Sequence, residues 1–250
     1  MDQGLLPTPF KLISLDSVGS TNDEARRLAQ TSAAADLLVV SATRQSAGRG
    51  RRGRAWVSPA GNLHFSLLIR IHSLSNAAQL GFAAAAALVR ALTALVPGPV
   101  FQAKWPNDVL VRGQKCAGML LESSDGDWLV LGIGVNVAAA PPPLGLNHPA
   151  CCLAELGFSG DAPTVLAAFC HEFLPLLAAW RRDGFAPVRQ AWLGCARGLG
   201  EATVVRLERD TQTGIFTGLD DEGALLLDQG AGGTRRILAG DVFFPENQAH

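Results

Sequence analysis

The segment from residue 48 to residue 54 combines glycine with arginine in the order Gly-Arg-Gly-Arg-Arg-Gly-Arg. Guanidinium groups suit the oxygens of phosphates and carboxylates, and glycines let the backbone approach a ligand closely. The segment matches a dinucleotide-binding turn, but residues 55–59 do not begin the helix that such a turn requires. It also matches half of a P-loop, although Arg54 and Ala55 stand where lysine and serine or threonine are needed. The pattern predicts a flexible loop that closes over a polyanion; a nucleic-acid-binding patch or a solvated loop are the alternatives.

A second motif, Lys-Trp-Pro-Asn-Asp, covers residues 104–108 just before a predicted strand. The residue before a proline is driven towards an extended backbone, so the motif can direct Lys104 and Asp108 into one site. A cation for phosphates beside a carboxylate for magnesium is what an ATP site needs. An exposed turn with a salt bridge is the alternative interpretation.

Three further motifs carry weaker signals. Lys115 lies at the mouth of an apolar strand, either as an edge residue or as a charge at the rim of a pocket. In Gly-Ile-Gly-Val-Asn, residues 132–136, alternate positions share one face of a strand, so the two glycines open a slot beside Asn136. That slot fits a flat ligand or a tightly packed helix. Ser-Thr-Asn, residues 20–22, offers hydrogen bonds to a compact polar ligand at a helix N-terminus, or simply caps that helix.

The elements that must position these residues follow from hydrophobic periodicity and turn signals. A helix is predicted at 21–30, where Thr21 and Glu24 have capping-box spacing. Longer helices are predicted at 76–96 and at 163–181, the latter kinked or split at Pro175. Strands are predicted at 37–42, 64–71, 108–112, 116–122 and 128–137, with loops at 45–56 and 141–143 and a turn at 113–114. After Trp192, short strands at 202–208, 214–219 and 224–227 predict a small β-barrel.

Composition narrows the class of protein. The chain has 250 residues, of which 48% are hydrophobic and 17% charged, which argues against disorder. With a net charge of -1, the molecule as a whole does not attract nucleic acid electrostatically. No signal peptide is recognised, and the apolar runs, such as residues 82–88, are short for a bilayer span. Five cysteines without metal-binding spacing predict reduced thiols in the cytosol.

Taken together, the five motifs in this order resemble the biotin–protein ligase family. The resemblance runs from about residue 17 to residue 137 and resumes faintly at Gly-Ala-Leu-Leu-Leu, residues 223–227. It implies an α+β fold, with a mixed or antiparallel sheet flanked by helices and a small C-terminal SH3-like β-barrel. It also implies a catalytic domain at residues 1–195 and a C-terminal domain at residues 196–250.

The resemblance implies a role for each matching residue. Ser20, Thr21, Asn22 and Gln45 would hydrogen-bond biotin. Gly48, Arg49, Gly50 and Arg51 would belong to a loop that orders over biotin and then over biotinyl-AMP, and Trp56 would pack on the adenylate. Lys115, Arg51 and Lys104 would be the catalytic cations, and Asp108 would hold Mg²⁺ for ATP. Asn136 would lie near the adenosine, and Asn107, Gly118 and Gly134 complete the implied binding residues.

The implied partner is a biotin carboxyl carrier protein, a subunit of acetyl-CoA carboxylase. Ser20 comes too early for an N-terminal helix-turn-helix domain, so we expect a stand-alone cytoplasmic ligase without specific DNA binding or membrane attachment. Family members often form homodimers. A lipoate ligase or octanoyltransferase is the nearest rival, but the Arg-Arg-x-Ser-Gly-Gly-Gly stretch of those ligases is missing from the sequence.

Overall fold

A seven-stranded sheet forms the centre of the protein in the computed structural model, which describes residues 6–71, 73, 76–124, 126–142 and 149–244. Its strands are β1 (Lys11–Val18), β2 (Leu38–Gln45), β3 (Leu63–Arg70), β4 (Phe101–Lys104), β5 (Asp108–Val111), β6 (Gln114–Ser123) and β7 (Trp128–Val135). The spatial order is β1-β2-β3-β7-β6-β5-β4. Only β1 and β2 run parallel, and the other neighbours are antiparallel. The predicted α+β class with a mixed sheet is confirmed.

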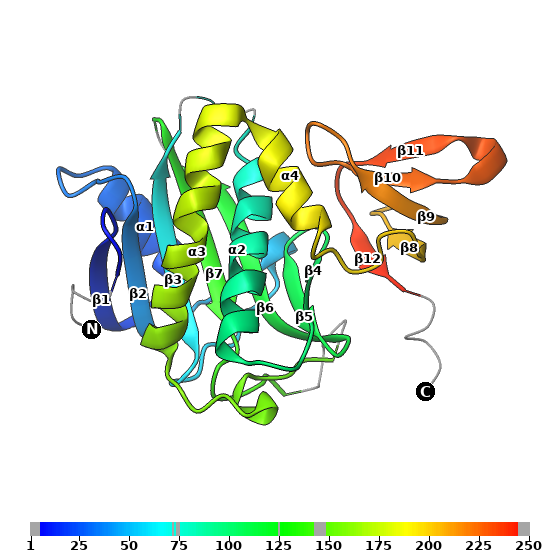
Figure 1. The fold of residues 1–250 in the computed structure, drawn as a ribbon. Helices are drawn as coiled ribbons and strands as arrows, with labels where there is room; N and C mark the ends of the chain where they lie inside the picture. Colours follow the sequence, from blue (N-terminus) through cyan, green and yellow to red (C-terminus); the bar gives the residue numbers. More distant parts are fainter. Residues whose placement is uncertain (1–5, 72, 74–75, 125, 143–148, 245–250) are drawn as a thin grey trace.

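Helices cover the two faces of this sheet unequally. Helices α2 (Gln79–Leu95) and α3 (Ala162–Asp183) lie across one face, and α4 (Phe185–Leu193) continues from α3 (Figure 1). Five consecutive alanines in α2, residues 83–87, are fully buried between the sheet and the neighbouring helices. Of the α-helices in the described part of the chain, α1 (Thr21–Ala29) alone covers the opposite face, and its small core joins Ala25 and Leu28 to residues of β2, β3 and β7. The rest of that face is left for the functional site.

Helix α1 begins at the predicted residue, but the predicted capping box is wrong. Its N-cap is Ser20, whose backbone is extended and whose side chain makes no capping hydrogen bond. Thr21 is already helical, and its hydroxyl donates to the side chain of Gln45. The Glu24 carboxylate pairs with Arg27 instead of turning back to the backbone. The polar side chains at this helix start are therefore engaged with the sheet.

Of the two alternatives predicted at Pro175, the split is wrong, and the kink stays a prediction. The helix runs unbroken over its 22 residues, with Pro175 inside it. By length and composition α3 is apolar enough to cross a membrane, which the short apolar runs did not suggest. However, Phe169, Cys170 and Phe173 are completely buried in the main core. This is the pattern of a core helix.

Several element boundaries differ from the prediction. Strand β1, strand β4 and helix α4 were not predicted, because β1 alternates buried and exposed residues weakly and the other two are short. The turn between β5 and β6 lies at Arg112 and Gly113, which both have positive φ, and Gln114 already begins β6. In the predicted loop 141–143, residue 143 lies outside the described part of the chain.

A separate antiparallel sheet follows α4. It contains β8 (Ala202–Arg206), β9 (Thr211–Leu219), β10 (Leu225–Asp228), β11 (Thr234–Ile237) and β12 (Asp241–Phe243), in the order β11-β10-β9-β8-β12. The predicted C-terminal β structure is confirmed, with β11 and β12 as strands that the sequence did not reveal. The domain boundary at residues 195 and 196 falls in the connection between α4 and β8, and as a boundary it stays a prediction.

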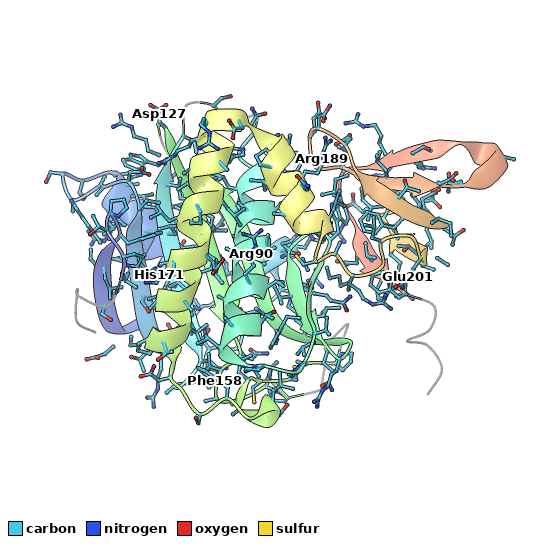
Figure 2. The ribbon with its side chains drawn as sticks, in the orientation of Figure 1. Arg90, Asp127, Phe158, His171, Arg189 and Glu201 are labelled. Carbon is cyan, nitrogen blue, oxygen red and sulfur yellow. The ribbon has the colours of Figure 1, made fainter. Side chains whose placement is uncertain are left out.

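The C-terminal sheet docks on the helical layer and on the β4–β5 hairpin. Trp192 of α4 packs edge-on against Phe216 of β9. The indole N–H of Trp105, between β4 and β5, donates to the carbonyl oxygen of Gly223 at 3.2 Å. Arg189 projects from α4 towards the C-terminal sheet (Figure 2) and pairs with Asp221 at 2.7 Å. These contacts join the C-terminal sheet to the main part of the protein.

Candidate active site

A cavity of about 610 Å³ opens beside α1, where strands β6 and β7 meet residues 46–56, here called the arginine loop. The β4–β5 hairpin and β12 complete its wall. All predicted binding and catalytic residues except Gly48 line the cavity: Ser20, Thr21, Asn22, Gln45, Arg49, Gly50, Arg51, Trp56, Lys104, Asn107, Asp108, Lys115, Gly118, Gly134 and Asn136. The fold thus gathers the five motifs of the sequence into one place.

Gly48 has a different part in the site, because it lies at the base of the loop. A Cβ at this position would lie 2.6 Å from the carbonyl oxygen of Trp56 and 2.8 Å from Oγ of Ser58. The Trp56 N–H donates to the Gly48 carbonyl oxygen at 2.9 Å. Only glycine allows the two ends of the arginine loop to approach this closely.

One end of the cavity is lined by neutral polar side chains that are bonded to one another. The Gln45 side-chain oxygen accepts from the backbone N–H of Thr21 at 2.8 Å and from its hydroxyl at 3.0 Å. The Ser66 hydroxyl lies 2.8 Å from Oγ1 of Thr21 and 2.5 Å from Oδ1 of Asn22. The Asn22 amide in turn donates to Glu122 at 2.6 Å. These bonds fix the orientation of each polar group before any ligand binds.

Two of these residues were missed by the sequence analysis. Ser66 is fully buried in β3 between apolar neighbours, and such an isolated hydroxyl in a buried strand was the available signal. Glu122 was predicted only as the last residue of the strand at 116–122, without a role.

The glycine slot predicted on β7 exists, and a flat side chain packs in it. A Cβ at Gly134 would overlap the indole of Trp56, and a Cβ at Gly118 would come within 3.2 Å of the same ring. A Cβ at Gly132 would overlap the amide of Asn22. Asn22 belongs to α1, so at Gly132 the alternative of a helix packed against a glycine face is correct. At Gly134 the neighbour is not a helix. The flat group comes instead from the arginine loop.

The other end of the cavity is cationic. Lys115 Nζ lies 2.6 Å from Oδ1 of Asp108 and 5.5 Å from the centre of the Trp56 ring. Arg51 donates to Oδ1 of Asn107 at 3.1 Å. Lys104 lies opposite Asp108 in the β4–β5 hairpin, which confirms that the Lys-Trp-Pro-Asn-Asp motif brings both residues to one site.

Burial lowers the pKa of two of these cations. Lys104 is only 4% exposed, and burial lowers the pKa of its amine to about 8 against the opposing pull of Asp108. Burial also lowers the pKa of the Arg51 guanidinium, opposed by the charges of Asp241 and Asp108. A polyanionic ligand would stabilise both charges, so this end is suited to phosphates.

The described part of the chain holds no cluster of three or more His, Cys, Asp or Glu side chains that could bind a metal ion. Asp108 offers a single carboxylate, and its Oδ1 already faces Lys115. One carboxylate fits Mg²⁺ only where phosphates and water supply its other ligands, as is usual for magnesium bound to a nucleotide.

Comparison with known sequences places the chain in a family. The sequence profile of the biotin/lipoate A/B protein ligase family matches residues 15–136, and that of the biotin protein ligase C-terminal domain matches residues 198–244. The chain therefore belongs to the biotin/lipoate A/B protein ligase family.

Individual relatives are named as biotin–acetyl-CoA-carboxylase ligases or as bifunctional ligase/repressors. The chain is 43% identical to a biotin–acetyl-CoA-carboxylase ligase of Paracoccus denitrificans, over 90% of this chain and 97% of that protein. It is 35% identical to the Mycobacterium tuberculosis protein of the same name, over 90% and 85% of the two chains. The fold is similar to that of the Aquifex aeolicus biotin protein ligase solved with biotin and ATP, with a TM-score of 0.81, 31% identity and coverage of 93% and 97%.

Proposed function

We propose that this protein is a biotin–protein ligase that activates biotin with ATP and transfers it to a lysine of a biotin carboxyl carrier protein. One observation carries the proposal. A single cavity has a neutral polar end at Asn22 and a cationic end at Lys115, and strands β6 and β7 run between the two ends. In biotinyl-5′-AMP an acyl chain likewise joins a neutral ureido ring to a phosphate. The family membership of the chain supports the same conclusion.

The neutral end is proposed to bind the ureido ring. Thr21, Asn22 and Gln45 already share hydrogen bonds, so they present fixed donors and acceptors to a ligand that has no charge. Ser20 lies beside them, 3% exposed. Binding a neutral ring here avoids the desolvation penalty that a charged ligand would suffer.

The cationic end is proposed to stabilise the first chemical step. A carboxylate oxygen of biotin attacks the α-phosphorus of ATP, and pyrophosphate leaves with the electrons of the broken P–O bond. Negative charge spreads over the phosphoryl oxygens, where Lys115, Arg51 and Lys104 neutralise it. Mg²⁺ would supply further positive charge on the ATP phosphates, with Asp108 as its one protein carboxylate. Trp56, Gly134 and Asn136 are proposed to form the adenosine side of the cavity.

In the second step the amine of the carrier lysine attacks the acyl carbon, and AMP leaves with the electrons of the C–O bond. The amine must lose a proton as the amide forms. The mixed anhydride reacts with water, so a covered cavity protects it until the carrier binds. The arginine loop is proposed to provide that cover, with Arg49 and Gly50 in the cavity wall.

The remaining predictions concern partners and location. We propose a carboxylase carrier domain as the protein substrate, which fits the names of the relatives. All five cysteines are free, which fits the expected cytoplasmic location. Association of two copies and the lack of specific DNA binding or membrane attachment stay predictions, to be checked by light scattering, by operator binding and by vesicle sedimentation.

The decisive experiment is transfer of labelled biotin to an apo biotin carboxyl carrier domain with ATP and Mg²⁺, run beside lipoate and octanoate. We expect transfer of biotin alone. Transfer of lipoate or octanoate instead would contradict the assignment of the neutral end. If no acyl-adenylate forms, the ligase proposal fails. The alternative, that the arginine loop binds nucleic acid, is then tested by measuring how the affinity for nucleic acid changes with salt.

A further inference from the structure

Three of the four arginines in the arginine loop form ion pairs with carboxylates outside the loop. The Arg49 guanidinium donates a hydrogen bond to each carboxylate oxygen of Asp23, at 2.6 and 2.7 Å. Arg52 and Arg54 both approach Asp241, at 3.4 and 3.3 Å. A loop that only attracted phosphates would leave these guanidiniums available, so their pairing needs another explanation.

The remaining arginine behaves differently. Arg51 bonds to Asn107 inside the cavity wall, and no ion pair of its guanidinium is found within the described residues. It lies between the two anchored positions. The loop therefore directs one guanidinium to the cavity and uses its neighbours to hold its own backbone in place.

The first anchor ties the start of the loop to α1. The Arg49 and Arg26 guanidiniums beside Asp23 lower the pKa of that carboxyl to about 2, Arg49 having the larger effect. Arg49 also lies 3.8 Å from Glu122, the carboxylate that holds the Asn22 amide. The loop start is thus connected to the neutral end of the cavity.

The second anchor ties the end of the loop to the other sheet. Asp241 is the first residue of β12, and its side chain is 23% exposed. It also belongs to the wall of the cavity. The two anchors approach the loop from opposite ends and from different parts of the fold, so releasing either one frees only half of the loop.

We propose that Asp23 and Asp241 are positioning residues that hold the arginine loop closed from its two ends and thereby set how long the acyl-adenylate stays in the cavity. This inference rests on the proposed function. Neither carboxylate needs to touch the reacting atoms. Each acts through an arginine of the loop, so its loss shortens the residence of the adenylate without removing a group that stabilises the transition state.

The test compares the full chain with D23N, D241N and the double variant. Labelled biotinyl-AMP is formed with ATP, Mg²⁺ and pyrophosphatase in the absence of carrier, and its release is followed after a chase with unlabelled biotin and ATP. We expect the rate of formation in D23N to stay near that of the unaltered chain, because Asp23 is not among the residues that line the cavity. Release should accelerate about threefold in each single variant and about tenfold in the double, as for exposed ion pairs whose effects add.

Matched controls come from ion pairs that do not touch the loop. Glu24 pairs with Arg27 on the same helix, and Glu222 pairs with Arg236 in the same C-terminal sheet. E24Q and E222Q should release the adenylate at the rate of the unaltered chain. D23E and D241E keep the charge and should restore most of the retention. Added salt should accelerate release from the unaltered chain much more than from the double variant, which a general loss of stability would not produce.

A second readout separates this inference from the proposed function. Trypsin cleaves after arginine, so cleavage within residues 49–54 of the ligand-free chain reports opening of the loop directly. Faster cleavage in D23N and D241N, with E24Q and E222Q unchanged, supports the anchors even if no adenylate forms. Unchanged cleavage and release in the double variant, or equal acceleration in the control variants, would overturn the proposal.

Discussion

The two ends of the cavity differ in how their polar groups are held. At the neutral end, Thr21, Asn22 and Ser66 are almost fully buried, and each is bonded to another side chain of the same network. At the cationic end, Lys115 and Asp108 form one close pair that keeps 27% and 17% of the side chains exposed. A neutral ligand needs hydrogen-bonding partners that are held rigidly. A polyanion needs cations that lie close together and can exchange an ion pair within the protein for one with the ligand. The following predictions test that contrast.

The largest effect is expected at the cationic end, from Lys115→Ala. Its loss removes positive charge next to the transferring phosphoryl group, which we expect to cost about 3 kcal/mol, or roughly a hundredfold in the rate of adenylate formation. Pyrophosphate release in single-turnover experiments measures this rate. Lys11→Ala, which removes an exposed lysine of β1, is the matched control. A near-normal rate in Lys115→Ala would show that the cationic end does not act on the phosphate.

Between the two ends, Gly134→Ala should displace the Trp56 indole from the slot. Overfilling a packed site costs about 2 kcal/mol, so we expect kcat/KM for ATP to fall roughly thirtyfold. Gly19→Ala is the control, because a Cβ there meets no atom within 4 Å. Trp56→Ala alone serves as the reference for the double variant, because Trp56 itself lines the adenosine side of the cavity. If the double variant Gly134→Ala with Trp56→Ala is no less active than Trp56→Ala, the clash with the indole causes the loss in Gly134→Ala.

At the neutral end, Ser66→Ala should disturb the orientation of Thr21 and Asn22 without removing a group that carries charge. Losing one buried hydrogen-bond donor costs about 1 kcal/mol, so we expect KM for biotin to rise roughly fivefold at nearly constant kcat. Ser41→Ala removes a buried hydroxyl that bonds the His64 carbonyl oxygen on the neighbouring strand, and should leave KM unchanged. A fall in kcat alone would contradict a role in binding.

The smallest effect concerns pH. Burial lowers the pKa of Lys104 to about 8, so its amine is charged below that pH and loses its proton as the pH rises through it. Attraction for ATP should weaken accordingly, and KM for ATP should rise roughly threefold between about pH 7 and about pH 9. Lys104→Arg keeps its charge over this range and should flatten the profile. An unchanged slope in Lys104→Arg would assign the titration to another group.

Deprotonation of Lys104 should weaken ATP binding as the pH rises but should increase the free energy of unfolding. The unfolded chain holds a proton on Lys104 up to about pH 10.5, whereas the folded chain releases it near pH 8. The free energy of unfolding therefore gains a contribution as the pH rises between these values. Denaturant unfolding at several pH values, compared between the unaltered chain and Lys104→Met, measures that contribution.

How much the sequence could predict depended on the distance along the chain between interacting residues. The pairing of Lys104 with Asp108 follows from one short hairpin, and the motif predicted it correctly. The ion pair of Arg54 with Asp241 joins residues 187 positions apart, and no local pattern indicates it. Four arginines close together in the sequence indicated a loop that binds phosphates. The carboxylates that pair with three of them come from α1 and β12, and their proximity is visible only in the folded structure. The sequence alone could not show which carboxylates lie next to these arginines in the folded protein.

The buried alanines of α2 have a consequence for engineering this protein. Residues 83–87 leave the helix without a solvent-facing side in that stretch, so a larger residue at any of them has nowhere to go. The neighbouring sheet and helices would have to separate, with penalties of about 1–3 kcal/mol for each added side chain. Random mutagenesis should therefore find this stretch depleted of substitutions in every selected library. Stabilising changes have to be sought on the outer surfaces of α3 and of the C-terminal sheet instead.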